Sequence, residues 1–166
     1  MRIILIPAFC LAALAQRPPD TVVNAMVDRG LAEQAMRLKT DERISFYAEL
    51  VKAKPETPHY QVLLAGAYIQ KMRETTDFQY IDRASKILDT VLDSDSKNYE
   101  ALRLRTQVNL ERHNFKTVAK DSLDLIKIAP ADPWNWGTLG DSYIELGDYD
   151  KAGDAYQKMM DLRPDL

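Results

Sequence analysis

The chain has 166 residues, of which 46% are hydrophobic and 28% are charged, and its formal net charge is −3. This composition is typical of an ordinary globular protein with enough apolar residues for one domain. Basic and acidic residues alternate along most of the length instead of forming a concentrated basic face, so the sequence argues against a nucleic-acid partner.

The first fifteen residues carry the features of a secretory signal peptide. Arg2 supplies a positive charge, a short apolar run follows, and an A-x-A cleavage signal ends at Ala15. The run is too short to cross a membrane, and the alternative, a buried N-terminal helix, would be interrupted by Pro7. We therefore expect residues 1–15 to be removed, leaving a periplasmic or secreted chain with no stable membrane span. Because the single cysteine, Cys10, lies in this segment, the mature chain would contain no disulfide.

The segment 16–56 has the pattern of an N-terminal helix pair. In its second half, "TDERISFYAELVKAKPETP" places Tyr47 and Leu50 on one helical face, and Pro55 follows the helix. The upstream partner, "TVVNAMVDRGLAEQAMRLK", is weakened at its centre by Gly30.

Three further helix pairs are predicted, at about 57–96, 97–130 and 131–166. The turn region of the first of them, around "RETTDFQYID", is longer than that of the last. The extra residues are either a recognition loop or the end of a longer first helix, with Phe78 and Tyr80 packing locally. The second alternative is the simpler one, because many plain connections are as long as this segment.

The last two pairs repeat at a constant interval of 34 residues. Matching positions are Leu102 and Trp136, Phe115 and Tyr149, Val118 and Ala152, Leu125 and Met159, and Pro130 and Pro164. In the last pair Asp132 caps the first helix, Gly147 ends it, and Asp148 caps the second. Gly140 and Ala152 are small, so the two helices can approach each other closely.

The last pair contains W-x2-L-G-x2-Y, then A-x3-Y-x2-M and a closing proline, and at this period it resembles the tetratricopeptide repeat (TPR). The middle pair departs from the pattern, because Arg105 and Thr106 stand where the family has a large apolar and a small residue. A shift of one residue restores an apolar stripe of Ala101, Leu104 and Val108. The resemblance implies an all-α fold, a TPR-like right-handed solenoid of antiparallel helix hairpins. In this fold 16–56 is a degenerate repeat and three repeats follow it.

The sequence offers no catalytic or metal-binding arrangement. His59 and His113 lack the i, i+4 spacing of helical metal ligands, and cleavage would remove Cys10, the single thiol. Asp89 and Asp93 do have that spacing, but such charged pairs usually form a solvated helix face. We expect a protein that is not an enzyme and that has no cofactor and no metal.

The resemblance also implies a concave groove, lined by the first helix of each repeat, that binds a peptide or protein surface. The positions expected to line it are His59, Val62, Gly66, Ile69, Arg103, Gln107, Leu110, Trp134, Asp141, Ile144 and Glu145. The binding contacts are expected from Val62, Arg103, Gln107, Trp134, Asp141, Ile144 and Glu145. Trp134 either anchors a ligand or packs against the preceding repeat. Relatives that grip chaperone carboxyl termini use Lys and Asn here, and only Arg103 could play that role, so that clamp is not expected.

The last helix raises a separate question, because repeat arrays normally end in a polar cap. Tyr156, Met159 and Met160 leave an apolar stripe that we expect to be an assembly face, with homo-oligomerisation as one outcome. The alternatives are a terminal helix polar enough to remain in water and a chain that is a fragment of a longer array. The sequence therefore predicts a non-enzymatic interaction scaffold of the exported compartment with a protein or peptide partner. The alternative is a structural assembly subunit that stacks through its C-terminal repeat.

Overall fold

The structure is a computed structural model that describes residues 30, 31 and 33–163. The expected signal peptide, residues 1–15, lies outside this range. The chain divides into two compact units, Met1–Leu38 and Lys39–Leu166. In the first unit, residues 30, 31 and 33–36 are helical.

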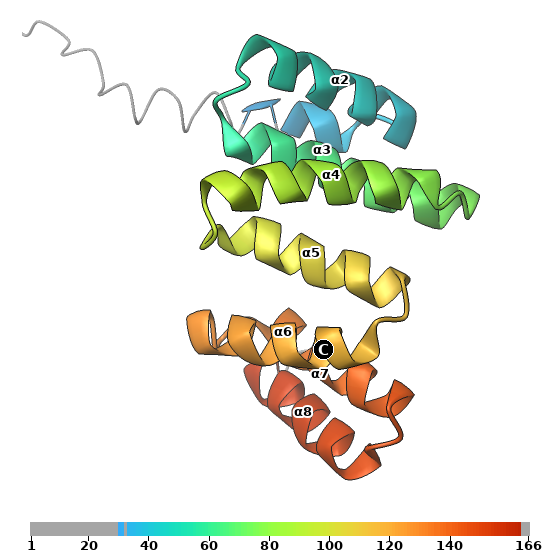
Figure 1. Ribbon diagram of the computed structural model, residues 1–166, viewed down its shortest axis with the longest axis vertical. Coiled ribbons are helices and arrows are strands. Elements are labelled where there is room, and N and C mark those ends of the chain that lie inside the picture. The colour runs from blue at the N-terminus through green and yellow to red at the C-terminus, as the bar shows by residue number, and fades with distance from the viewer. Residues whose placement is uncertain (1–29, 32, 164–166) are drawn as a thin grey trace, which may run out of the picture. The chain divides into compact units, whose positions relative to one another are not determined.

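The second unit is built from helices in its described part, and no strand occurs there. The helices are α2 (Thr40–Ala53), α3 (Pro58–Thr75), α4 (Gln79–Ser94), α5 (Tyr99–Glu111), α6 (Phe115–Ile128), α7 (Pro133–Glu145) and α8 (Tyr149–Leu162). Each helix packs against the next one along the chain, and α3 also contacts α5. Figure 1 shows the resulting stack, in which α3–α4, α5–α6 and α7–α8 form successive hairpins. The all-α prediction is confirmed.

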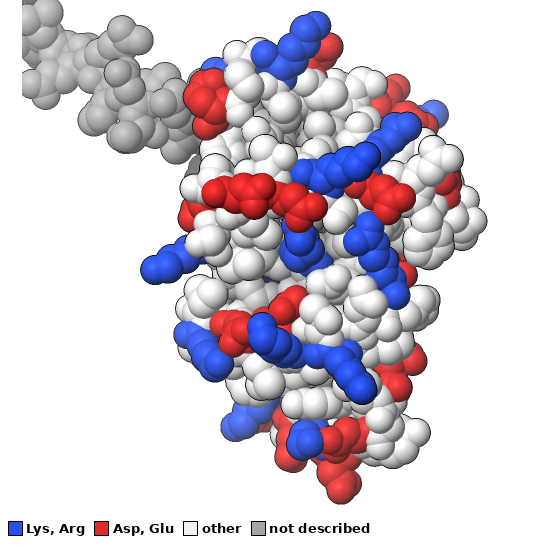
Figure 2. All heavy atoms as spheres, viewed as in Figure 1, with Lys and Arg blue, Asp and Glu red and all other residues white. Residues whose placement is uncertain are grey.

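The face that carries α4, α6 and α8 has no single-sign charge patch. Figure 2 shows Lys and Arg side chains interleaved with Asp and Glu side chains over this face. Charged pairs also join α5 to α4, including Arg112 with Asp82 at 2.7 Å and Arg105 with Asp89. This mixture is the solvated helix surface that the alternating charges of the sequence predict.

Local sequence signals explain most helix ends. The Asn98 and Asp132 side chains accept hydrogen bonds from backbone amides at the starts of α5 and α7. Gly147 adopts φ +77° after α7, a conformation that favours glycine. Asp148 occupies the N-cap position of α8, as expected, and its carboxylate accepts a hydrogen bond from the Lys151 side chain at 2.5 Å.

The extra residues of the first complete hairpin extend a helix. α3 has 18 residues, whereas α5 and α7 each have 13. Thr76 ends α3 with φ +56°, and Tyr80 then stacks on Tyr68 with ring centroids 6.0 Å apart. Of the two alternatives for this segment, the longer helix is therefore the one observed. The local packing expected of Phe78 was wrong, because this side chain is 52% exposed.

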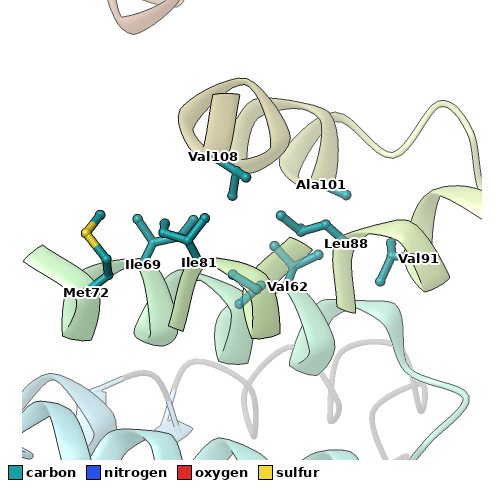
Figure 3. Packing of buried hydrophobic residues seen from close by; sticks show 10 residues of the cluster. Val62, Ile69, Met72, Ile81, Leu88, Val91, Ala101 and Val108 are labelled. Atoms are coloured by element: carbon teal, nitrogen blue, oxygen red, sulfur yellow. The ribbon is translucent and has the colours of Figure 1, made fainter. Parts of the chain in front are cut away.

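The main core lies between α3, α4 and α5. Figure 3 shows Val62, Ile69, Ile81 and Leu88 converging beneath Val108 of α5. The apolar stripe expected for α5 is confirmed, because Ala101 and Val108 are fully buried and Leu104 packs against the same cluster. The one-residue shift expected with it was wrong, because α5 and α7 begin and end 34 residues apart. Thr106 of α5 is also buried, and its hydroxyl donates to the Leu102 carbonyl at 3.0 Å.

The last hairpin depends on two glycines of α7. A Cβ atom at Gly140 would lie 2.6 Å from Cε1 of Tyr156, and one at Gly137 would lie 2.8 Å from Sδ of Met159. The glycines therefore let large side chains of α8 lie directly on the α7 backbone. The close approach expected at Gly140 is confirmed.

Candidate functional site

A cavity of about 440 Å³ opens where the first helices α3 and α5 meet beside α2. Its apolar wall consists of Val62, Leu63 and Leu104, and Gly66 leaves room because only Leu104 Cδ1, at 3.7 Å, lies near its Cβ position. Its polar lining includes Arg43, His59, Glu100 and Arg103. The cavity thus offers an apolar surface beside several charged groups, as binding pockets commonly do.

Arg103 and Trp134 connect this cavity to α7. The Arg103 guanidinium lies over the Trp134 ring, 4.5 Å from its centroid, and Arg103 Nε is 3.5 Å from an oxygen of Asp132. A cation over an indole face is a favourable contact. Trp134 is half-buried and packs on the preceding repeat through this contact, which is one of the two alternatives that the sequence left open.

A buried polar cluster fixes α7 against α5. Asn135 is fully buried, and its Nδ2 donates to the Tyr99 hydroxyl at 2.9 Å and to the Ala129 carbonyl at 3.1 Å. The Tyr99 hydroxyl in turn donates to Asp132 at 2.8 Å, and burial raises the pKa of Tyr99. Because Asp132 also caps α7, this cluster holds the Arg103–Trp134 pair in position.

A second hollow, of about 310 Å³, lies beside α7. It contains Asp141, Ile144 and Glu145 together with Tyr156 from α8 and Leu110, His113 and Phe115. The Tyr156 hydroxyl donates to Asp141 at 2.8 Å. Burial and the Asp141 carboxylate raise the pKa of Tyr156 to about 12, so the hydroxyl keeps its proton at neutral pH.

Three residues that were expected to line the groove serve mainly in packing. Val62 and Ile69, which are 5% and 2% exposed, are core residues, because α3 turns this face toward α4 and α5 (Figure 3). Val62 still forms part of the cavity wall. The Gln107 amide oxygen is assigned toward Arg73 of α3, from which it accepts hydrogen bonds of 3.1 and 2.6 Å. Arg73 also pairs with Glu111, so Gln107 belongs to an α3–α5 network.

The expected assembly face is largely turned inward. Tyr156 contacts the Gly140 site and bonds to Asp141, while Met159 covers Gly137, so these two side chains close the α7–α8 hairpin. The inward face of α8 continues through Ala152, which is 1% exposed. Met160 is 51% exposed and is the one member of the three that points to water. Tyr156 and Met159 are half-buried and contribute to closing the hairpin, and the expected assembly face stays a prediction.

Sequence reasoning missed the contributions of α2 and of the α5 start. Arg43 and Tyr47 from α2 and Tyr99 and Glu100 from α5 line the larger cavity. The 34-residue interval could not indicate these residues. It shows which positions face each other within one hairpin, but the cavity is also lined by α2, the helix that precedes the first complete hairpin. Asn135 was missed for a related reason: its equivalent 34 residues earlier is Ala101.

The described residues contain no group of three or more His, Cys, Asp or Glu side chains placed to hold a metal ion. None of the described helices is long and apolar enough to cross a membrane.

Comparisons with known proteins agree with this architecture. A model of the family described as ChAPs (Chs5p-Arf1p-binding proteins) matches residues 10–155. The solved structure of TTC0263, a thermophilic TPR protein of Thermus thermophilus, has a TM-score of 0.67 and 17% identity, covering 76% of this chain and 66% of that one. MamA from Desulfovibrio magneticus RS-1 has a TM-score of 0.64 and 23% identity, covering 84% and 76%. These likenesses show the fold, and the predicted TPR-like right-handed solenoid is confirmed.

Two curated relatives share part of the sequence. Tetratricopeptide repeat protein 29 of Macaca fascicularis is 26% identical over 137 residues, which cover 82% of this chain and 26% of that protein. Aspartyl/asparaginyl beta-hydroxylase of Mus musculus is 23% identical over 149 residues, which cover 87% of this chain and 20% of that protein. The chain therefore spans between a fifth and about a quarter of the length of these relatives.

Proposed function

The chain belongs to the ChAPs family and is a tetratricopeptide-repeat protein, and from this premise we propose that it is a non-enzymatic scaffold that binds a peptide or protein surface along α3, α5 and α7. The family's name describes proteins that bind Chs5p and Arf1p, which supports protein partners as the class of ligand. The similarity to the hydroxylase covers only a fifth of that enzyme and gives no reason to assign its activity here. The signal-peptide features of residues 1–15 support an exported location.

The observation that carries this proposal is the hollow between α3 and α5, where Arg103 contacts Trp134 of α7, together with a smaller hollow beside α7. The larger hollow borders α3 and α5, and the smaller borders α7. Ile144 is 42% exposed at the smaller hollow, and Arg103 has a side chain that is 38% exposed. Preformed apolar surface beside oriented charges suits an extended or helical peptide.

Selection of random twelve-residue peptides against the full chain tests the proposal. We expect peptides to be enriched on the wild-type chain, and a synthetic copy to bind about tenfold or more weakly after Trp134→Ala, because this ring holds the Arg103 guanidinium beside the larger hollow. Ile144→Ser should weaken binding by a smaller factor. The matched control is Ile128→Ser on α6, where the isoleucine is 56% exposed and lies outside both hollows. Failure to enrich any peptide, or equal losses in Ile144→Ser and Ile128→Ser, would contradict groove binding.

A second candidate function is assembly through the last helix. Tyr149 and Met160 of α8 are 69% and 51% exposed, and exposed apolar side chains of this size favour an interface. Under this function the partner contacts would lie on α8 and would leave α3 and α5 free.

A further inference from the structure

A third hollow, of about 320 Å³, lies between the second helices α4 and α6 and beside α5. Figure 1 shows α5 between these two helices. The apolar wall of this hollow consists of Leu92 of α4, Leu102 of α5, and Leu125 and Ile128 of α6. Among the described residues it shares no lining residue with the two hollows of the first helices, so it is a separate surface from the proposed groove.

Three residues that depart from the repeat pattern meet in this hollow: Arg105, Thr106 and Asp121. The residues 34 positions later are Leu139, Gly140 and Ala155. In the last hairpin Leu139 and Ala155 belong to an apolar cluster, whereas the matching positions of the middle hairpin place a cation and a carboxylate at the hollow. A position that breaks an otherwise consistent pattern is often functional.

Asp121 is a half-buried carboxylate without a counter-ion. None of the ion pairs between described residues includes it, and the hydrogen bond that its side chain accepts there, from Asn109 Nδ2, is long at 3.4 Å. Burial raises the pKa of the Asp121 carboxyl, although the nearby charge of Lys120 lowers it in part. The ionised carboxylate therefore has a desolvation cost that a bound cation would offset.

The two basic residues of the hollow have acidic partners of their own. Arg105 pairs with Asp89 of α4. The Lys120 side chain is 77% exposed, and its Nζ lies 3.6 Å from an oxygen of Asp124. Asp121 is thus the charged group of the hollow that remains available to a ligand.

The apolar wall selects the kind of cation. Lys and Arg side chains have aliphatic stems that pack along apolar surface while the charged group reaches a polar partner. A simple inorganic cation would gain nothing from such a wall. Ile128 is 56% exposed, so apolar side chains next to the basic one on a protein ligand would cover it.

We propose that the hollow between α4, α5 and α6 is a second protein-binding site, which takes a Lys or Arg side chain beside an aliphatic residue of a partner protein, with Asp121 as the carboxylate that receives the charge. This inference goes beyond the proposed groove function and does not depend on it.

The test selects random twelve-residue peptides on the full wild-type chain, with counter-selection against Asp121→Asn, which keeps the shape of the side chain and removes its charge. We expect the surviving peptides to be enriched in Lys or Arg next to Leu, Ile or Val. A synthetic copy should bind Asp121→Asn about tenfold more weakly than the wild type, because a charge-assisted hydrogen bond is lost. Replacing the basic residue of the peptide with Gln should cost about as much.

Two serine variants separate this site from the groove. Ile128→Ser should weaken the peptide selected at this hollow, whereas Ile144→Ser should not, since Ile144 lies at the smaller hollow beside α7. Trp134→Ala, which should weaken groove peptides, should leave this peptide unaffected. The two sites can therefore fail independently of each other.

A stability measurement distinguishes binding from a structural role of Asp121. At neutral pH, Asp121→Asn should unfold at the same or a higher urea concentration than the wild type, because the amide has no charge to desolvate. Earlier unfolding, peptides without basic enrichment, no surviving peptide, or equal binding to Asp121→Asn would overturn the inference and leave the groove function standing. A wild-type dimer that Asp121→Asn dissociates would overturn it as well, because the occupant would then be a second copy of this chain.

Discussion

Replacing Leu88 with alanine is expected to lower the free energy of unfolding by about 2–5 kcal/mol. Leu88 is fully buried in the cluster that joins α3, α4 and α5, and Figure 3 shows it beside Val62 and Ala101. Truncation removes apolar burial and leaves a cavity that three helices cannot easily collapse to fill. Because a protein of this size is stabilised by only about 5–15 kcal/mol, the loss would be a large fraction of the total.

Urea denaturation followed by circular dichroism measures this effect, and Leu123→Ala on α6 is the matched control. Leu123 is 42% exposed, so the same truncation there should cost less than about 1 kcal/mol. Equal losses at the two positions would mean that α4 does not pack between α3 and α5 as described.

A methyl group at position 140 should destabilise the last hairpin. The new Cβ of Gly140→Ala would lie 2.6, 2.7 and 2.8 Å from three ring atoms of Tyr156, which is too close for non-bonded carbon atoms. The ring must move, and it would then lose its 2.8 Å hydrogen bond to Asp141. Overpacking of this kind costs about 1–3 kcal/mol.

Gly153→Ala provides a control of opposite sign on the same hairpin. Nothing lies within 4 Å of a Cβ at this exposed position of α8, so alanine should stabilise the helix by about 0.5–1 kcal/mol. Hydrogen exchange locates the Gly140→Ala effect: α7 and α8 should lose protection, while α3 and α4 should keep theirs, since repeat units contact only their neighbours. Destabilisation by both substitutions would show that the α7–α8 contact is not the cause.

The fold could be predicted because several independent sequence signals in each repeat indicate the same helix hairpin. The 34-residue interval, the proline and glycine signals at helix ends and the small residue at Gly140 each imply the same hairpin, and the structure has it. Arg105 and Thr106 departed from the pattern in α5. The structure accommodates them because Arg105 pairs with Asp89 of α4 and the Thr106 hydroxyl donates to the Leu102 carbonyl one turn earlier.

The site could be predicted only in part, because a groove depends on how neighbouring hairpins meet. Helical periodicity places Val62 on the first helix but does not show that its face turns into the core. Periodicity likewise could not show that Tyr156 and Met159 pack against α7. That depends on the distance between these side chains and the glycines of α7, which only the structure gives. Arg43 lies on a helix that sequence reasoning assigned to a different repeat, so its place in the cavity emerged only from the structure.

The measurement that tests the central claim most directly is hydrogen exchange of the full chain with and without a selected peptide. If the first helices form the binding surface, added peptide should increase protection in α3, α5 and α7 and leave α4, α6 and α8 almost unchanged. Protection confined to α8, rising with the concentration of the chain and indifferent to peptide, would contradict groove binding and would favour the assembly function instead.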